Sequence, residues 1–167
     1  MSLPQALIHK ANEMLELCKL HGVMLATAES CTGGLVAASL TAISGSSSVV
    51  ERGFVTYSNQ AKIEMLGVPG ALIEAYGAVS AEVARAMAEG AVAHSRADVA
   101  LSITGIAGPD GGTPAKPVGT VHIAAAQRGA PTLHRACLFP GDRDSVRDQS
   151  AIAAMELLIE QICSFRR

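Results

Sequence analysis

The chain is organised around Ala26-Thr27-Ala28-Glu29-Ser30-Cys31-Thr32-Gly33-Gly34. Apolar residues 23–25 lead into this segment, and the apolar run 35–40 follows it. Two apolar runs joined by a Gly-rich segment are typical of a buried strand, a tight turn and a helix. We therefore expect Ser30 at or beside the first helical turn, where unpaired N–H groups and the helix dipole favour negative charge. A hydroxyl there suits a nucleophile whose carbonyl substrate becomes an oxyanion, although the local pattern alone equally fits a Ser or Thr helix cap.

The composition indicates one compact domain over residues 1–167. Hydrophobic residues make up 49%, charged residues 17% and aromatic residues 3%, with no Trp, so the core must consist of Ala, Val, Leu and Ile. A formal charge of -2 and the lack of aromatic side chains argue against nucleic-acid binding. No stretch is apolar for long enough to span a membrane, and the acidic residues near the N-terminus argue against a signal peptide.

The four cysteines are scattered, with no C-x-x-C pair. A zinc site or a disulfide framework is therefore not expected, and reduced thiols in the cytoplasm are the default. The cysteines are Cys18, Cys31, Cys137 and Cys163.

Apolar spacing along the chain predicts alternating helices and strands. An amphipathic helix is expected over residues 7–18, between Pro4 and Gly22. The mixture of parallel-type and hairpin strands with flanking helices predicts a single-domain α/β protein, a three-layer α/β/α sandwich with a mixed sheet. The other expected elements are a strand at 49–57 with a bulge at Gly53, a short helix containing Lys62 and capped by Ser58 or Asn59, a helical piece around 72–74, a helix over 80–94, a strand at 99–104, a hairpin of 118–127 and 132–139, and a last helix after Asp142.

Three polar loops follow apolar strands, at residues 29–34, 57–62 and 104–112. Ligands of open α/β sheets gather beyond the carboxyl ends of the strands, so we expect these loops to converge there. None of the five histidines belongs to one of these loops, which gives little support to a Ser-His-Asp triad. The glycines of the third loop lack the following Lys of a Walker phosphate loop, so an NTPase is disfavoured.

Lys62 is the candidate base for Ser30. A lysine has an ordinary pKa of about 10.4, and burial beside an apolar helix face would lower it because desolvation disfavours the ammonium form. Tyr57, at the end of the preceding strand, could relay the proton or hold Lys62 in place. The alternative is an exposed helix lysine and a strand-end aromatic residue without a role.

Other residues compete for roles at the same loops. Cys31 is a rival nucleophile, although a small buried thiol is the favoured interpretation. Glu29 is expected to orient the turn or to form an ion pair, because no matching Asp/His cluster accompanies it as in a metal site. Arg143, with Arg147 four residues later, could bind a phosphate or carboxylate, or could pair with neighbouring acidic residues.

Taken together, five motifs in order resemble the CinA C-terminal-domain family, over a match from about residue 5 to the C-terminus. The N-terminal domain of full-length CinA proteins lies outside this match, so its pyrophosphatase activity is not transferred. The motifs are residues 28–34, residues 54–59 with Lys62, residues 104–109 with Gly111 and Gly112, residues 116–121, and residues 141–143.

Stand-alone members of this family are nicotinamide-nucleotide amidases. The resemblance implies hydrolysis of nicotinamide mononucleotide to nicotinate mononucleotide and ammonia, without a metal or a cofactor. It also implies that Ser30 is the nucleophile, Lys62 the base and Tyr57 the companion of Lys62. A homo-oligomer is also expected. The alternative is a non-catalytic nucleotide- or protein-binding module of the competence/damage-inducible type. The residues expected to form the oxyanion and substrate site are Cys31, Thr32, Gly33, Gly34, Asn59, Thr104, Gly105, Gly108 and Arg143, with N–H groups near Thr32 and Gly33 facing the oxyanion and Arg143 holding the phosphate.

Overall fold

The computed structural model describes residues 2–165, and its centre is a five-stranded mixed sheet. The strand order is β2-β1-β3-β4-β5, in which β1 runs parallel to β2 and β3, while β4 runs antiparallel to both β3 and β5. The mixed sheet is as predicted, and its order could not be read from the sequence. The strands are β1 Leu25–Glu29, β2 Val50–Val55, β3 Val99–Gly105, β4 Thr120–Gln127 and β5 Leu133–Leu138.

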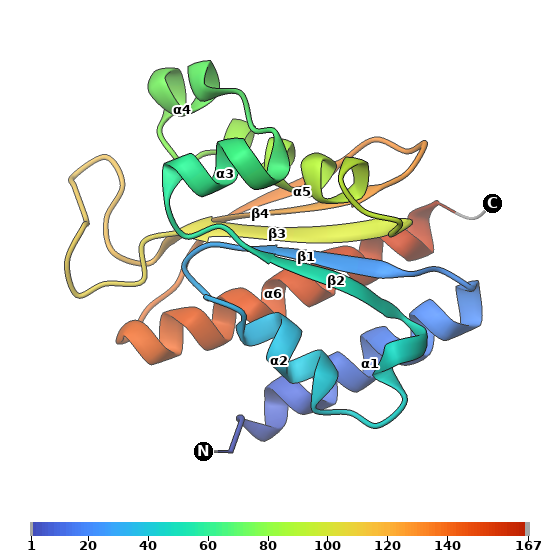
Figure 1. The fold of residues 1–167 in the computed structure, drawn as a ribbon. Coiled ribbons are helices and arrows are strands. Elements are labelled where there is room, and N and C mark those ends of the chain that lie inside the picture. The colour runs from blue at the N-terminus through green and yellow to red at the C-terminus, as the bar shows by residue number, and fades with distance from the viewer. Residues whose placement is uncertain (1, 166–167) are drawn as a thin grey trace.

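Helices cover both faces of the sheet, which confirms the three-layer α/β/α sandwich (Figure 1). Helices α1 Gln5–His21, α2 Leu35–Thr41 and α6 Arg143–Ser164 lie on one face. Helices α3 Asn59–Leu66, α4 Gly70–Tyr76 and α5 Ala81–Ala93 lie on the other, and a 3-10 turn, Ser46–Ser48, precedes β2. Among the described helices, none combines the length and the apolar character that a membrane crossing requires.

Two apolar cores lie between the sheet and the helices, one on each face of the sheet. The core beneath α1, α2 and α6 contains long side chains such as Leu15, Leu101 and Met155. The core beneath α5 is built largely from alanines of α5 and of three strands, so this helix packs close to the sheet. The expectation of a core poor in aromatic residues is confirmed.

Strand β2 contains the predicted β-bulge, but the bulge is not at Gly53. The register of β1 with β2 passes from Leu25–Val50 to Ala26–Arg52, so Glu51 is the additional residue. Gly53 serves a different purpose, because a Cβ atom there would stand 2.9 Å from Thr27 Oγ1 on the neighbouring strand. The glycine allows β1 and β2 to approach closely, and the bulge lies two residues earlier.

The parallel strands β2, β1 and β3 are neighbours and end at the same edge of the sheet. The loops that follow them are the three polar loops singled out in the sequence, so the expected convergence is confirmed. Helix α3 follows β2 and rests on α5 beside this edge, with Gly90 of α5 facing the end of α3 at Leu66.

Replacement of Gly90 by Ala tests this close helix packing. The added Cβ would overlap the Leu66 carbonyl oxygen, which is main chain and cannot move aside alone. Overpacking of this kind costs about 1–3 kcal/mol, more than the roughly 1 kcal/mol that Ala gains in helix propensity. We expect urea denaturation to show a lower free energy of unfolding for Gly90→Ala. The control is Gly70→Ala, whose Cβ would stand at an ordinary 3.5 Å from Ile63 Cδ1; equal stabilities of the two variants would contradict the packing described.

Candidate active site

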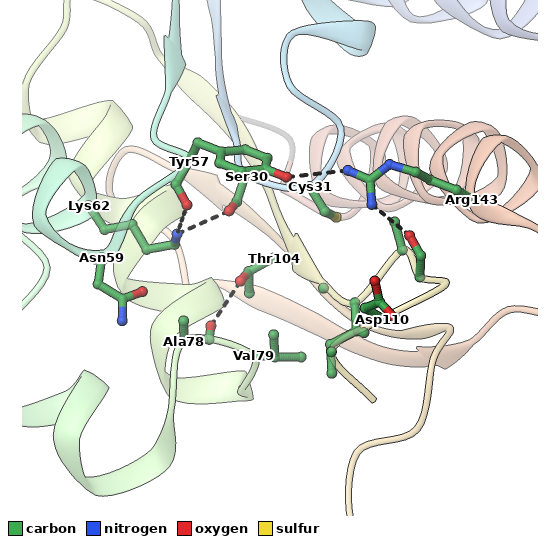
Figure 2. Close-up of a pocket in the computed structure, with 15 residues that line it drawn as sticks. Ser30, Cys31, Tyr57, Asn59, Lys62, Ala78, Val79, Thr104, Asp110 and Arg143 are labelled. Carbon is green, nitrogen blue, oxygen red and sulfur yellow. Dashed lines mark hydrogen bonds between the residues drawn. The ribbon is translucent and has the colours of Figure 1, made fainter. Parts of the chain in front are cut away.

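A cavity of about 280 Å³ lies at this edge of the sheet (Figure 2). All three polar loops contribute to its walls, and α6 adds one residue. The residues that line it are Ser30, Cys31, Tyr57, Asn59, Lys62, Ala78, Val79, Thr104, Gly105, Ile106, Ala107, Gly108, Asp110, Gly111 and Arg143.

Lys62 is fully buried, with 1% of its surface exposed, although it belongs to a short helix at the molecule's periphery. Ser58 caps this helix by accepting a hydrogen bond from the N–H of Ala61. It is one of the two residues predicted as the cap. The Nζ atom of Lys62 lies 3.0 Å from Ser30 Oγ, 3.0 Å from the Thr56 carbonyl oxygen and 3.3 Å from the Tyr57 carbonyl oxygen. The predicted contact between base and hydroxyl is therefore present and direct.

The environment of Lys62 favours the neutral amine. Burial lowers the pKa of Lys62, and among the described residues no carboxylate lies within ion-pair distance to oppose this effect. A neutral amine has two N–H donors and one lone pair. The carbonyls of Thr56 and Tyr57 can take both donors, so the lone pair is left for the proton of Ser30. Chemically, an amine placed in this way can act as a general base toward the hydroxyl.

Glu29 holds the turn that carries Ser30. Its carboxylate is fully buried and accepts the N–H groups of Val36 at 2.9 Å and Ala37 at 3.1 Å. Ser30 itself donates its N–H to the Ile103 carbonyl of β3. The predicted role of Glu29 in orienting the turn is confirmed, and the carboxylate compensates the N-terminal donors of α2.

The expectation that Ser30 lies at a free helix N-terminus is wrong. Residues 30–34 form a turn, and α2 begins only at Leu35. The first N–H groups of α2 are occupied by Glu29, so they offer no site for a substrate anion. Thr32, Gly33 and Gly34 do not line the cavity. The N–H of Gly33 donates to the Ser30 carbonyl, and that of Leu35 donates to the Thr32 carbonyl.

Tyr57 differs from its predicted geometry. Its side chain is 62% exposed, and its hydroxyl accepts a hydrogen bond from Arg143 at 3.3 Å (Figure 2). The hydroxyl therefore does not stand between Ser30 and Lys62, and a proton relay through it is not supported. Tyr57 holds Lys62 through its main-chain carbonyl instead.

Cys31 is a poor nucleophile in this place. Burial raises the pKa of its thiol to about 11, and only 7% of the residue is exposed. A thiol with such a pKa remains protonated near neutral pH, whereas the thiolate is the reactive form. The favoured interpretation of Cys31 as a small buried thiol agrees with this environment.

The loop after β3 forms the opposite wall of the cavity. Thr104 Oγ1 donates to the Ala78 carbonyl and ties this wall to the segment before α5. Gly108 has a φ of +85°, and a Cβ there would clash with Val118, so only glycine fits. Arg143, the first residue of α6, donates to the Gly108 carbonyl at 2.7 Å. The guanidinium thereby joins the third loop to the rim of the cavity.

Two charged residues near the cavity were missed as site residues. Asp110 contributes a carboxylate to the lining, but its position in an irregular Gly-rich loop gave no sign of this. Arg147 donates to the carbonyls of Cys31 and Thr32. Its spacing of four from Arg143 was visible, although the sequence does not tell which of the two faces the cavity.

Residues 2–165 contain no cluster of three or more His, Cys, Asp or Glu side chains arranged to hold a metal ion. None of the five histidines lines the cavity. His122 and His134 stack on each other across β4 and β5, with a distance of 2.9 Å between Nδ1 and Nε2.

The family model of the CinA C-terminal domain matches residues 8–162, which is nearly the whole chain. The chain belongs to the CinA C-terminal domain family. The resemblance inferred from the five sequence motifs is thus confirmed, and the Ser30–Lys62 pair lies within the matched part of the CinA domain.

Relatives of this CinA domain differ in length and in name. Nicotinamide-nucleotide amidohydrolase PncC of Escherichia coli (strain K12) is 50% identical over 156 residues, covering 93% of this chain and 94% of that protein. A CinA-like protein of Citrifermentans bemidjiense is 57% identical over 137 residues, covering 82% of this chain but 33% of that protein. The chain thus spans about a third of the length of the first curated relatives it matches. The crystal structure of competence/damage inducible protein CihA from Agrobacterium tumefaciens is similar at a TM-score of 0.92 and 46% identity, over 96% of this chain and 98% of that one.

The pH dependence of stability tests the burial of Lys62 in this CinA domain. Because burial lowers the pKa of Lys62 in the folded state, the unfolded chain binds more protons between that pKa and about 10.4. Wild-type stability should therefore rise with pH across this window, relative to Lys62→Met. At pH values below the pKa of Lys62 in the folded protein, the stability advantage of Lys62→Met over the wild type should be at its largest and should no longer change with pH.

The measurement is the melting temperature of both proteins at a series of pH values. The control is Lys10→Met, because the Glu13 hydrogen bond raises the pKa of Lys10, so its contribution to stability stays constant below about 10.4 and is lost only at higher pH. A difference between wild type and Lys62→Met that stays constant up to pH ~10.4 would refute a lowered pKa.

Proposed function

We propose that the chain is an amidohydrolase that converts nicotinamide mononucleotide and water to nicotinate mononucleotide and ammonia, as a step of pyridine nucleotide salvage. The observation that carries this proposal is the contact of 3.0 Å between the buried Lys62 amine and Ser30 Oγ. The relationship to nicotinamide-nucleotide amidohydrolase PncC, over nearly the full length of both chains, supports the same substrate.

In the first step, Lys62 takes the proton of Ser30 while Ser30 Oγ attacks the carboxamide carbon. The negative charge moves to the carboxamide oxygen, and the new ammonium keeps its contacts with the Thr56 and Tyr57 carbonyls. These carbonyls stabilise a positive charge that arises only during the reaction. They act in a buried place where such interactions are stronger than in water.

In the second step, the tetrahedral intermediate collapses and the C–N bond breaks. The Lys62 ammonium returns its proton to the leaving nitrogen, which departs as ammonia and leaves an ester on Ser30. Water then attacks this ester, with Lys62 taking one water proton and returning it to Ser30 Oγ. Atoms and charges balance without any metal or redox cofactor.

The charges of the cavity complement those of the proposed substrate. Nicotinamide mononucleotide carries a cationic pyridinium ring and an anionic phosphate. Asp110 supplies a carboxylate to the cavity lining, and Arg143 supplies a guanidinium at the rim. We assign the phosphate to Arg143, because guanidinium groups bind phosphate oxygens in a forked geometry.

The second candidate function is a non-catalytic module that binds a nucleotide or a partner protein. It is supported by relatives that are named only CinA-like and of which this chain spans a third. A binding module would not need a fully buried lysine in contact with a serine hydroxyl, which is why we favour the enzyme. A cytoplasmic location and a homo-oligomeric state remain predictions.

Release of ammonia from nicotinamide mononucleotide separates these candidates. We expect release by the wild type, with or without a chelator, and a loss of more than about a thousandfold for both Ser30→Ala and Lys62→Met. Cys31→Ala should retain most of the activity, because this substitution removes only the thiol and leaves the main-chain N–H of residue 31 in place. Activity that survives Ser30→Ala would reject this nucleophile, and a wild type without any release would favour the binding module.

The phosphate assignment has its own test. Arg143→Ala should lower kcat/KM for nicotinamide mononucleotide by about 10–100-fold, as expected for loss of a charged hydrogen bond. The same substitution should change kcat/KM for the dephosphorylated nicotinamide riboside by much less. An equal loss on both substrates would show that Arg143 does not bind the phosphate.

A further inference from the structure

Arg147 of α6 is committed to the turn that carries Ser30. Its Nε atom donates to the Cys31 carbonyl at 3.2 Å, and its Nη2 atom donates to the Thr32 carbonyl at 3.0 Å. Within the part of the chain that the structure describes, no carboxylate lies within ion-pair distance of Arg147. One guanidinium therefore holds two successive peptides of this turn, Cys31–Thr32 and Thr32–Gly33.

Most N–H donors near Ser30 are already used. The first N–H groups of α2 donate to Glu29, and the N–H of Gly33 donates to the Ser30 carbonyl. Between residues 2 and 165, neither the Cys31 N–H nor the Thr32 N–H donates to the main chain of another residue. An oxyanion formed at Ser30 needs such donors. Of the two, only the Cys31 N–H belongs to a residue that lines the cavity, so it is the donor left for an oxyanion.

The peptides of this turn are trans, and in a trans peptide the C=O and the N–H point in opposite directions. Because Arg147 holds the Cys31 carbonyl, the N–H of the same peptide, which belongs to Thr32, points away from Arg147. Because the Ser30 carbonyl accepts the Gly33 N–H inside the turn, the N–H of Cys31 points out of the turn. Cys31 itself lines the cavity.

We propose that Arg147 is the positioning residue of the oxyanion hole: by holding the Cys31 and Thr32 carbonyls it fixes the turn so that the N–H of Cys31, which lines the cavity, faces the substrate oxygen. This inference rests on the proposed amide hydrolysis. Without Arg147 the peptide after Cys31 is free to rotate, which would loosen the turn and misdirect the Cys31 N–H.

The charge of Arg147 reaches this turn. Burial raises the pKa of the Cys31 thiol, and the positive charge of Arg147 acts against this increase. A negative charge on a substrate oxygen bound to the same turn would experience the same favourable potential. Arg147 touches neither substrate nor reacting atoms, so its effect is exerted through the two peptides.

The chain offers a matched control in Arg128. Its Nη2 atom also donates to two main-chain carbonyls, those of Val92 and Ala97, both at 2.9 Å, far along the sheet from Ser30. Arg128→Met therefore removes the same kind of interaction without touching the active-site turn. Arg147→Lys keeps the charge but loses the forked geometry, and it serves if Arg147→Met does not fold.

The test is steady-state release of ammonia from nicotinamide mononucleotide. For Arg147→Met we expect kcat to fall about 100-fold while KM changes little, with Arg147→Lys intermediate and Arg128→Met close to wild type. The pyridine-3-carbaldehyde analogue of the substrate forms an oxyanion adduct with Ser30, so its affinity should fall in parallel with kcat. The affinity for nicotinate mononucleotide, which forms no such adduct, should not change.

An unchanged kcat in Arg147→Met, or an equal loss in Arg128→Met, would overturn the inference. So would equal losses of affinity for the aldehyde and for nicotinate mononucleotide, because those indicate a distorted cavity and not a misdirected N–H group. Each of these results leaves the amidohydrolase proposal standing. A wild type that releases no ammonia would overturn that proposal itself.

Discussion

The structure depends on a buried lysine, Lys62, that pairs with no carboxylate among residues 2–165. Desolvation of an ammonium group is costly, and the Lys62 amine avoids this cost by becoming neutral more easily than an exposed lysine. Two main-chain carbonyls and the Ser30 hydroxyl complete its hydrogen bonds. This buried amine beside a hydroxyl is the observation on which the proposed chemistry rests.

The fold provides what this arrangement requires. The end of β2 supplies the two carbonyls, and α3 returns Lys62 beneath them because Ser58 caps the helix directly after the strand. Glu29 occupies the donors of α2, so the turn with Ser30 is held from one side by a carboxylate. Arg147 holds the same turn from α6. The turn that carries Ser30 is thus held by two groups of opposite charge, the Glu29 carboxylate and the Arg147 guanidinium.

Much of this arrangement could be predicted from the sequence. The apolar runs and Gly-rich loops indicated the layers of the sandwich, and the rule that ligands gather at the carboxyl ends of parallel strands brought Ser30 and Lys62 together. The motifs of the CinA family strengthened both assignments. These features depend on local patterns of a few residues, which a sequence displays directly.

The remaining features depend on where a side chain or a main-chain group points in the folded protein, and the residue type does not encode that. Tyr57 was predicted to act through its hydroxyl, whereas it holds Lys62 through its carbonyl, a group that every residue has. Arg143 and Arg147 are one helical turn apart, and only the placement of α6 against the sheet decides which faces the cavity. The start of α2 was expected too early, because the buried carboxylate of Glu29 allows the turn to continue for five residues before the helix begins.

The most direct test of the central claim is an NMR titration of the Lys62 side chain. The Nζ and Cε resonances would be assigned by their absence in Lys62→Met and followed with pH. A protonation midpoint clearly below the ordinary value of about 10.4 is predicted. A Lys62 that remains an ammonium ion until pH ~10.4 would contradict the account, because such a group could not accept the proton of Ser30 at neutral pH.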